Sequence, residues 1–286
     1  MNLAFTMQKT QDWFTQQWVI LWGRKINSKK YNWLIGPYGE LNGIGENFIY
    51  QLAKKENLVV KRNSKTGGLL KSIHSLCLTE KELDNLSEKI IDFYTHTSNY
   101  KLHIKVKWNP FFYFFGILVN QLFSKRINQL NIPTKNTKKA EKISSEIIEL
   151  VNSETNDVKY TIWLRKFERT GKVIYSGVYG TCKLPSGMTC IKAVFPLPKG
   201  NATVIMKPIV GQNNELILNS SGKKFGDTGF YFLLNDSKNN NWSQFISTFK
   251  DKLIISEKNN LLEAQQTLYL WGIKVVIFNY NIEKSL

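Results

Sequence analysis

The residue pair best suited to acid–base chemistry in this sequence is Asp92 and His96. The two residues are four positions apart in a segment with helical spacing, so their side chains share one face and can form a hydrogen bond. A carboxylate in this position orients an imidazole ring for proton transfer. We therefore predict Asp92 and His96 as candidate catalytic residues. The alternative is that His96 only interacts with the negative end of the helix dipole.

A second group of polar residues follows the aromatic segment 108–123. An arginine fork with neighbouring amides can bind a carboxylate, a phosphate or a carbonyl at the edge of an apolar pocket. We predict a ligand site built from three polar and three aromatic side chains: Arg126, Gln129, Asn131, Trp108, Phe112 and Phe115. In the alternative interpretation, the polar residues cap a helix and join the two halves of the chain.

Asp227 lies in the sequence Gly226-Asp-Thr-Gly229, directly before an apolar segment that contains Tyr231. This position places a carboxylate at the entrance of a predicted strand. We add Asp227 and Tyr231 to the predicted ligand site. The alternative role of Asp227 is that of an ordinary turn residue.

Signatures of metal, phosphate and hydrolase chemistry are absent from the sequence. The three histidines, His74, His96 and His103, lack the spacing of a zinc site. No phosphate-binding loop and no nucleophile elbow occurs. We expect no metal and no cofactor, and whether the chain is an enzyme stays open.

The chain of 286 residues has a net charge of +17, but only five of its 39 basic residues are arginine. The basic excess is spread evenly along the chain, and specific base readout favours arginine. We therefore expect no specific nucleic-acid partner. An anionic membrane surface is the alternative partner for such a charge.

Trp18 and Trp22 lie four positions apart, close to Lys25, Lys29 and Lys30. This pattern resembles an interfacial membrane anchor, but packing of the tryptophans against the β half of the chain is the favoured explanation. No segment reaches the ~18–20 apolar residues that span a bilayer, and the first residues do not resemble a secretory signal. We expect a cytoplasmic protein, with membrane association as an alternative.

The cysteines, Cys77, Cys182 and Cys190, are odd in number and widely spaced, which favours reduced thiols. One bridge between Cys182 and Cys190 stays an alternative, because the two can lie on neighbouring strands.

The first half of the chain shows helical spacing. Residues 43–56 predict a helix, and Thr79-Glu-Lys-Glu82 is a capping box before a helix that should reach about Thr97. Residues 100–107 alternate as a half-exposed strand. Pro110 should begin a helix that runs to about Asn128.

The second half is rich in alternating segments separated by turn residues. In the first of these, Ile162 and Leu164 face one side while Trp163 and Arg165 face the other. Further strands are expected at 172–182, 188–196, 202–210, 215–219, 228–234, 252–258, 262–270 and 273–282. Residues 241–249 fit a helix. The alternation of the last 125 or so residues resembles lipocalin-like sheets in its texture, without the early GxW motif, because no glycine stands two positions before Trp163.

Together these patterns predict an α+β fold. A mainly helical part (1–133) would pack, after a polar connector (134–157), on an antiparallel sheet (158–286) that curls into a half-barrel. Such sheets commonly enclose apolar cavities. We expect the chain to bind a hydrophobic small molecule or lipid between this sheet and the aromatic helix. The alternatives are an enzyme acting on such a molecule and a peripheral membrane or protein-interaction module.

Overall fold

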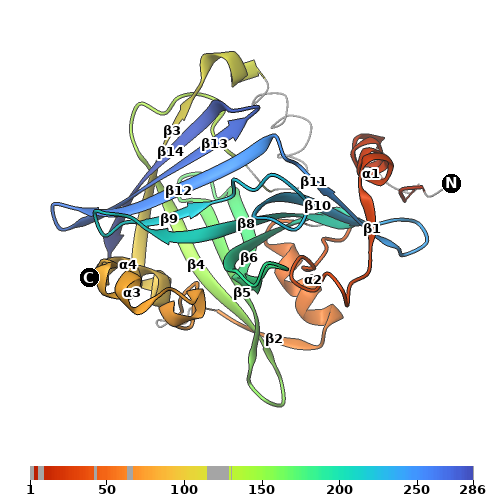
Figure 1. Ribbon diagram of the computed structural model, residues 1–286, viewed down its shortest axis with the longest axis horizontal. Coiled ribbons are helices and arrows are strands. Elements are labelled where there is room, and N and C mark those ends of the chain that lie inside the picture. Colours follow the sequence, from red (N-terminus) through yellow and green to blue (C-terminus); the bar gives the residue numbers. More distant parts are fainter. Residues whose placement is uncertain are drawn as a thin grey trace.

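A computed structural model describes residues 3–5, 10–41, 44–62, 67–114, 129 and 131–285 of the chain. Its main feature is a closed antiparallel β-barrel of ten strands (Figure 1). Around the barrel, the strands follow the order β8-β7-β6-β5-β4-β3-β14-β13-β12-β9, and pairing of β9 with β8 closes the ring. The barrel strands are β3 (Tyr100–Trp108), β4 (Glu141–Asn152), β5 (Val158–Phe167), β6 (Val173–Lys183), β7 (Thr189–Leu197), β8 (Gly200–Val210), β9 (Leu216–Asn219), β12 (Phe249–Lys258), β13 (Leu261–Leu270) and β14 (Ile273–Lys284).

Two-residue turns connect the last three strands. Asn259 and Asn260 between β12 and β13 have φ angles of 48° and 67°, and Trp271 and Gly272 between β13 and β14 have φ angles of 52° and 81°. Two consecutive residues with positive φ match the right-handed twist of antiparallel hairpins. These turns therefore fix the register of the hairpins.

Three further strands form a side sheet that leaves the barrel at β8. Residues 200–205 of β8 pair with β10 (Gly229–Asn235), while residues 207–210 pair with β9. β10 pairs with β11 (Asn241–Phe245), which pairs with β1 (Arg24–Ile26). β8 thus changes its pairing partner along its length, from β10 of the side sheet to β9 of the barrel.

Helices pack against the barrel strands. α2 (Asn47–Lys55) buries Phe48 and Leu52 against the outer side of β4 to β6, and β2 (Leu58–Lys61) pairs with β4. The short helices η1 (Ile73–Leu76), α3 (Glu80–Asn85), α4 (Glu88–Thr95) and η2 (Thr97–Asn99) follow. Their buried side chains, such as Ile90 and Phe93, join the same core as the barrel residue Phe278.

α1 (Thr10–Trp22) lies on the side sheet, on the side of the molecule opposite α3 and α4 (Figure 1). Val19 and Ile20 pack against Leu234 of β10. No helix in the described part of the chain is long and apolar enough to cross a membrane.

The expected α+β fold is wrong, because the sheet closes into a barrel and the first half of the chain supplies part of it. β3 was expected as a strand, and β4 lies within the segment expected to be a polar connector. Polar residues at 144–146 interrupt the apolar positions of β4 and hide its alternation. Pairing with β5 along almost its full length makes this segment a strand.

Two local predictions also need correction. The helix expected at 241–249 is wrong, because residues 241–245 pair with β10 and residues 241–243 also pair with β1. The helix expected after the capping box is divided into α3 and α4, although the capping box itself is confirmed: Thr79 Oγ1 accepts a 3.3 Å hydrogen bond from Glu82 N. Of the helix expected at 110–128, η3 (Pro110–Phe112) is seen, and residues 115–128 lie outside the described residues.

Candidate ligand site

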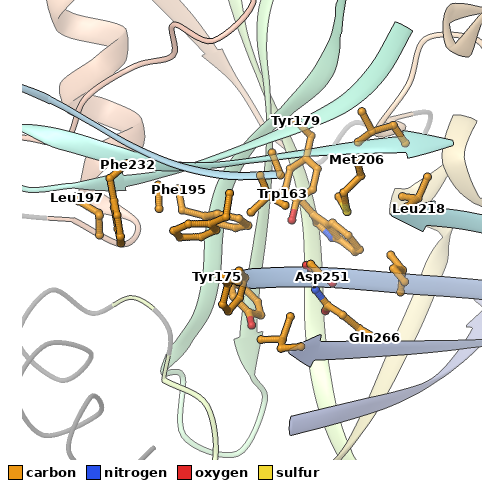
Figure 2. A pocket seen from close by; sticks show the side chains of 18 of the residues that line it. Trp163, Tyr175, Tyr179, Phe195, Leu197, Met206, Leu218, Phe232, Asp251 and Gln266 are labelled. Atoms are coloured by element: carbon orange, nitrogen blue, oxygen red, sulfur yellow. Dashed lines mark hydrogen bonds between the residues drawn. The ribbon is translucent and has the colours of Figure 1, made fainter. Parts of the chain in front are cut away.

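The barrel contains a partly open cavity of about 400 Å³ (Figure 2). Alternate residues of a strand point to the same side, and inward side chains of β5 to β9, β12 and β13, with two from β10, form its wall. The wall is mainly aromatic and aliphatic; its members include Trp163, Ile191, Phe195, Val204, Met206, Leu218, Phe230, Phe232, Phe249 and Leu268. Leu69, Leu70 and Tyr94 contribute from the segment that contains η1 and α4.

A compact polar group interrupts this apolar wall. Arg165 of β5 is 7% exposed, and its Nη2 donates a 2.9 Å hydrogen bond to the hydroxyl of Tyr179. The guanidinium carbon lies 4.0 Å from the ring centre of Trp163 and 4.6 Å from that of Tyr175. These two rings hold the guanidinium through cation–π contacts. The Nε atom of Arg165 is buried and has no hydrogen-bond partner.

Asp251 of β12 and Gln266 of β13 complete the polar group. Gln266 Nε2 donates a 2.7 Å hydrogen bond to Asp251 Oδ2, whereas Asp251 Oδ1 is buried without a partner. Figure 2 shows Tyr175, Asp251 and Gln266 close together, with Trp163 and Tyr179 facing them. Four strands thus bring their polar side chains to one region of an apolar cavity.

Burial controls the protonation of this group. Burial raises the pKa of Asp251 to about 7, and the hydrogen bond from Gln266 offsets part of the rise. Asp251 therefore exchanges its proton near neutral pH. Burial also raises the pKa of Tyr175 and of Tyr179, so both hydroxyls stay neutral and can donate hydrogen bonds.

One end of the cavity lies beneath α1. Asp12, Thr15 and Gln16 of α1 line it, and Gln16 Nε2 donates a 2.8 Å hydrogen bond to the carbonyl of Pro198. The opposite face of α1 is unusual, because Phe14, Leu21 and Trp22 are 64%, 63% and 72% exposed. Trp18 is also partly exposed to solvent, and its ring contacts the ring of Phe232. The helix thus presents a polar edge to the cavity and an apolar face to solvent.

The predicted pair Asp92 and His96 is brought together at the end of α4. His96 Nδ1 lies 3.0 Å from Asp92 Oδ1, and Asp92 Oδ2 accepts hydrogen bonds from Tyr100 and Lys284. Burial raises the pKa of Asp92, but the bonds from Lys284 and Tyr100 outweigh this and lower it overall. Neither Asp92 nor His96 is among the described residues that line the cavity. Their catalytic role stays a prediction.

The predicted amide residues have backbone partners. Gln129 Nε2 donates a 2.8 Å hydrogen bond to Ser176 O, and Gln129 Oε1 accepts one of 2.7 Å from Ser176 N. Asn131 Nδ2 donates to Val173 O at 2.7 Å. β7 pairs with β6 only from Val178 onward, so Gln129 and Asn131 bond the part of β6 that β7 leaves uncovered.

The remaining predicted ligand residues are distributed over different places. Trp108 donates from Nε1 to Pro133 O at 2.8 Å, and Phe112 packs in the core. Asp227 Oδ2 accepts bonds from the amides of Lys223 and Lys224, and the buried Tyr231 hydroxyl donates to Asp227 O. None of these residues is among the described residues that line the cavity. Arg126 and Phe115 lie outside the described residues.

Cys182 and Cys190 face one another across β6 and β7, as the hairpin alternative supposed, and both are free thiols. Burial raises the pKa of Cys182 to about 11 and that of Cys190 to about 12. Both therefore stay protonated and unreactive near neutral pH. Across the part of the chain that the structure covers, no three His, Cys, Asp or Glu side chains are arranged to hold a metal ion.

Sequence reasoning missed the polar group of the cavity: Arg165, Tyr175, Tyr179, Asp251 and Gln266. A usable signal existed for Arg165, which is a rare arginine and shares a strand face with Trp163. Asp251 stood just before the strand expected at 252–258. The strand pairing that brings Asp251 near Arg165 has no local signature in the sequence.

Comparison with known proteins finds no matching family model and no matching solved structure. The chain is similar to a Bacillus subtilis (strain 168) protein called "Uncharacterized membrane protein YndJ". The two are 27% identical over 241 residues, which cover 84% of this chain and 41% of YndJ. The chain thus spans about two fifths of the length of the curated relative that it matches.

Proposed function

We propose that this chain binds a hydrophobic small molecule, or the acyl chain of a lipid, inside its barrel. The observation that carries the proposal is the cavity of about 400 Å³ with its aromatic and aliphatic wall. Ligand pockets usually measure roughly 300–1,000 Å³ and combine apolar walls with a few convergent polar groups. A closed ring of paired strands keeps such a wall in place without the ligand.

The enzyme alternative has less support. It relied on His96, Asp92 and Arg126, and neither His96 nor Asp92 lines the cavity. The polar residues that do line it are suited to holding a head group, because they combine a fixed charge with neutral hydrogen-bond donors. Binding therefore explains the site with fewer assumptions than catalysis does.

Native mass spectrometry of freshly purified protein tests the proposal by looking for a co-purified amphiphile. A second test uses Ala193→Phe, because Ala193 lines the cavity and a larger side chain there fills it. Gln265→Phe, at an exposed position on the outer face of β13, is the matched control. We expect Ala193→Phe to lose binding of a polarity-sensitive fluorescent probe and Gln265→Phe to keep it. Equal probe binding by both variants would argue against a ligand in the barrel.

A second candidate function is attachment to an anionic membrane surface through α1. The exposed apolar side chains of α1 are followed by the exposed cations Arg24, Lys25, Lys29 and Lys30. Aromatic side chains with adjacent basic residues suit the interface of an anionic leaflet. The name of the Bacillus relative, a membrane protein, is consistent with this proposal. Such attachment would place the chain at the cytoplasmic face, where anionic lipids lie.

Co-sedimentation with lipid vesicles tests this second function. We expect the wild type to bind vesicles that contain phosphatidylserine and not vesicles of phosphatidylcholine alone, and salt should weaken binding. The double variant Trp18→Ser/Trp22→Ser should lose binding. Leu261→Ser, which removes an exposed apolar side chain from the start of β13, is the control and should retain binding. If the wild type binds neither kind of vesicle, the proposed membrane attachment is wrong.

A further inference from the structure

The cavity contains a buried positive charge whose hydrogen bonds are incomplete. Arg165 donates a hydrogen bond to Tyr179 and also interacts with the hydroxyl of Tyr280, but its Nε has no partner. Among the described residues, no acidic side chain lies within 4.0 Å of its guanidinium nitrogens. The guanidinium group is always charged, and burying an unpaired charge is costly. The free N–H groups of Arg165 therefore call for an acceptor from a bound molecule.

Asp251 supplies a second unpartnered group in the same cavity. Its Oδ1 is buried without a hydrogen bond, and the residue is 5% exposed. Because its pKa is raised to about 7, a large part of the population carries a proton at neutral pH. In that form Asp251 donates a hydrogen bond and does not cancel the charge of Arg165. The polar group as a whole then has a positive charge.

An apolar path leads from this polar group toward α1. Phe195 packs on Tyr175 and Tyr179, with ring centres 5.5 and 6.2 Å apart. Phe232, which also lines the cavity, packs against Trp18 of α1 at 6.5 Å. A molecule with its polar end at Arg165 therefore has apolar side chains beside it as far as the helix.

We propose that the ligand is a single-chain amphiphile with a carboxylate head, which binds Arg165 while its hydrocarbon chain extends toward α1. This inference rests on the proposed ligand-binding function and adds the chemistry of the head. The planar arginine fork matches the two oxygens of a carboxylate and can donate two parallel hydrogen bonds to it. The Tyr179 hydroxyl, which accepts a bond from Arg165, has its own proton left to donate to the same head.

The inference is tested on the wild-type protein with three ligands that share one hydrocarbon chain and differ in the head group. Dodecanoate, dodecanol and dodecyl phosphate are titrated below the concentrations at which they form micelles. We expect dodecanoate to bind about 10- to 100-fold more tightly than dodecanol, as loss of a charge-assisted hydrogen bond implies. Equal affinity for dodecanoate and dodecanol would overturn the carboxylate head and leave the proposed function standing. Tighter binding of dodecyl phosphate would also overturn it, and no binding of any of the three would contradict the proposed function itself.

Variants of two arginines test whether Arg165 causes the preference for dodecanoate over dodecanol. Arg165→Met should reduce the ratio of dodecanoate to dodecanol affinity to about one. Arg169→Met is the control, because Arg169 is exposed in the turn between β5 and β6, and it should keep the wild-type ratio. A preference that survives in Arg165→Met would overturn the role of Arg165. If Arg165→Met does not fold, the wild-type titrations alone decide between a carboxylate head and a neutral one.

Discussion

Gln266 donates a 2.7 Å hydrogen bond from its side-chain amide to the carboxylate of Asp251 inside the barrel cavity. The two residues lie on the neighbouring strands β12 and β13, so the bond spans one strand pair. It satisfies one oxygen of Asp251 and leaves the other unbonded. One neutral hydrogen bond does not compensate for removing a carboxylate from water, and this explains why the pKa of Asp251 rises to about 7.

The first prediction concerns stability and pH. The folded state keeps a proton on Asp251 that the unfolded state releases, since the pKa rises from 3.8 to about 7. The contribution of Asp251 to the free energy of unfolding therefore falls as the pH rises from about 4 to 7 and stays low above that. The full loss is at most about 4 kcal/mol. Asp251→Asn cannot ionise and therefore avoids this loss of stability. The variant should be more stable than the wild type at pH 8, and the difference in unfolding free energy should be smaller at pH 5.

Denaturant unfolding at both pH values measures this difference. Asp84→Asn, which changes an exposed carboxyl on α3, is the control and should behave like wild type. An Asp251→Asn variant with the same gain at both pH values would show that the pKa of Asp251 is not raised.

The second prediction concerns the pH dependence of carboxylate binding. As the pH rises through about 7, Asp251 ionises, and its negative charge then repels the head of the ligand. Dodecanoate affinity should therefore fall between pH 6 and pH 8, and Asp251→Asn should abolish most of that fall. Among the described residues, the other ionisable groups near this site are Arg165, Tyr94, Tyr175, Tyr179, Tyr280 and, on α1, Asp12. If dodecanoate affinity falls between pH 6 and pH 8 in Asp251→Asn as it does in the wild type, another ionisable group causes the pH dependence.

The third prediction concerns the length of the hydrocarbon chain. Each methylene group buried in the cavity contributes about 0.8 kcal/mol, which is about a fourfold gain in affinity. Affinity should rise from octanoate upward and level off once the cavity of about 400 Å³ is filled. Calorimetric titration of a series of fatty acids measures this. Ala193→Phe should shift the plateau to a shorter chain, and a continuous rise up to palmitate would indicate binding on an open surface.

The alternating pattern of the second half predicted most of its strands because each strand has its own apolar period. It predicted the faces of β5 as well, since Ile162 and Leu164 pack under α2 while Trp163 and Arg165 point inward. Which face becomes the interior depends on how the sheet curls. The closure of β9 on β8 is a long-range pairing, and no local pattern encodes it.

The candidate site was harder to predict for the same reason. Asp92 and His96 are four positions apart, so a local rule brought them together correctly. Arg165 and Asp251 are separated by more than eighty residues and line the same cavity only because of the order of strands in the barrel. Residues 241–249 show the opposite error: their spacing suits a helix, but pairing with two neighbouring strands makes 241–245 extended.

The fourth prediction concerns Gln129, whose side chain is fully buried and bonds both backbone groups of Ser176. Gln129→Leu keeps a similar volume but leaves the amide and the carbonyl of Ser176 without these partners. Each unsatisfied buried group costs about 1–3 kcal/mol, so the variant, with two such groups, should lose about 2–6 kcal/mol of unfolding free energy. Gln265→Leu, at an exposed position on β13, is the control and should change stability by less than about 0.5 kcal/mol. Denaturant unfolding compares the two variants. A Gln129→Leu protein as stable as the control would show that the bonds to Ser176 contribute little, because water would then replace them in solution.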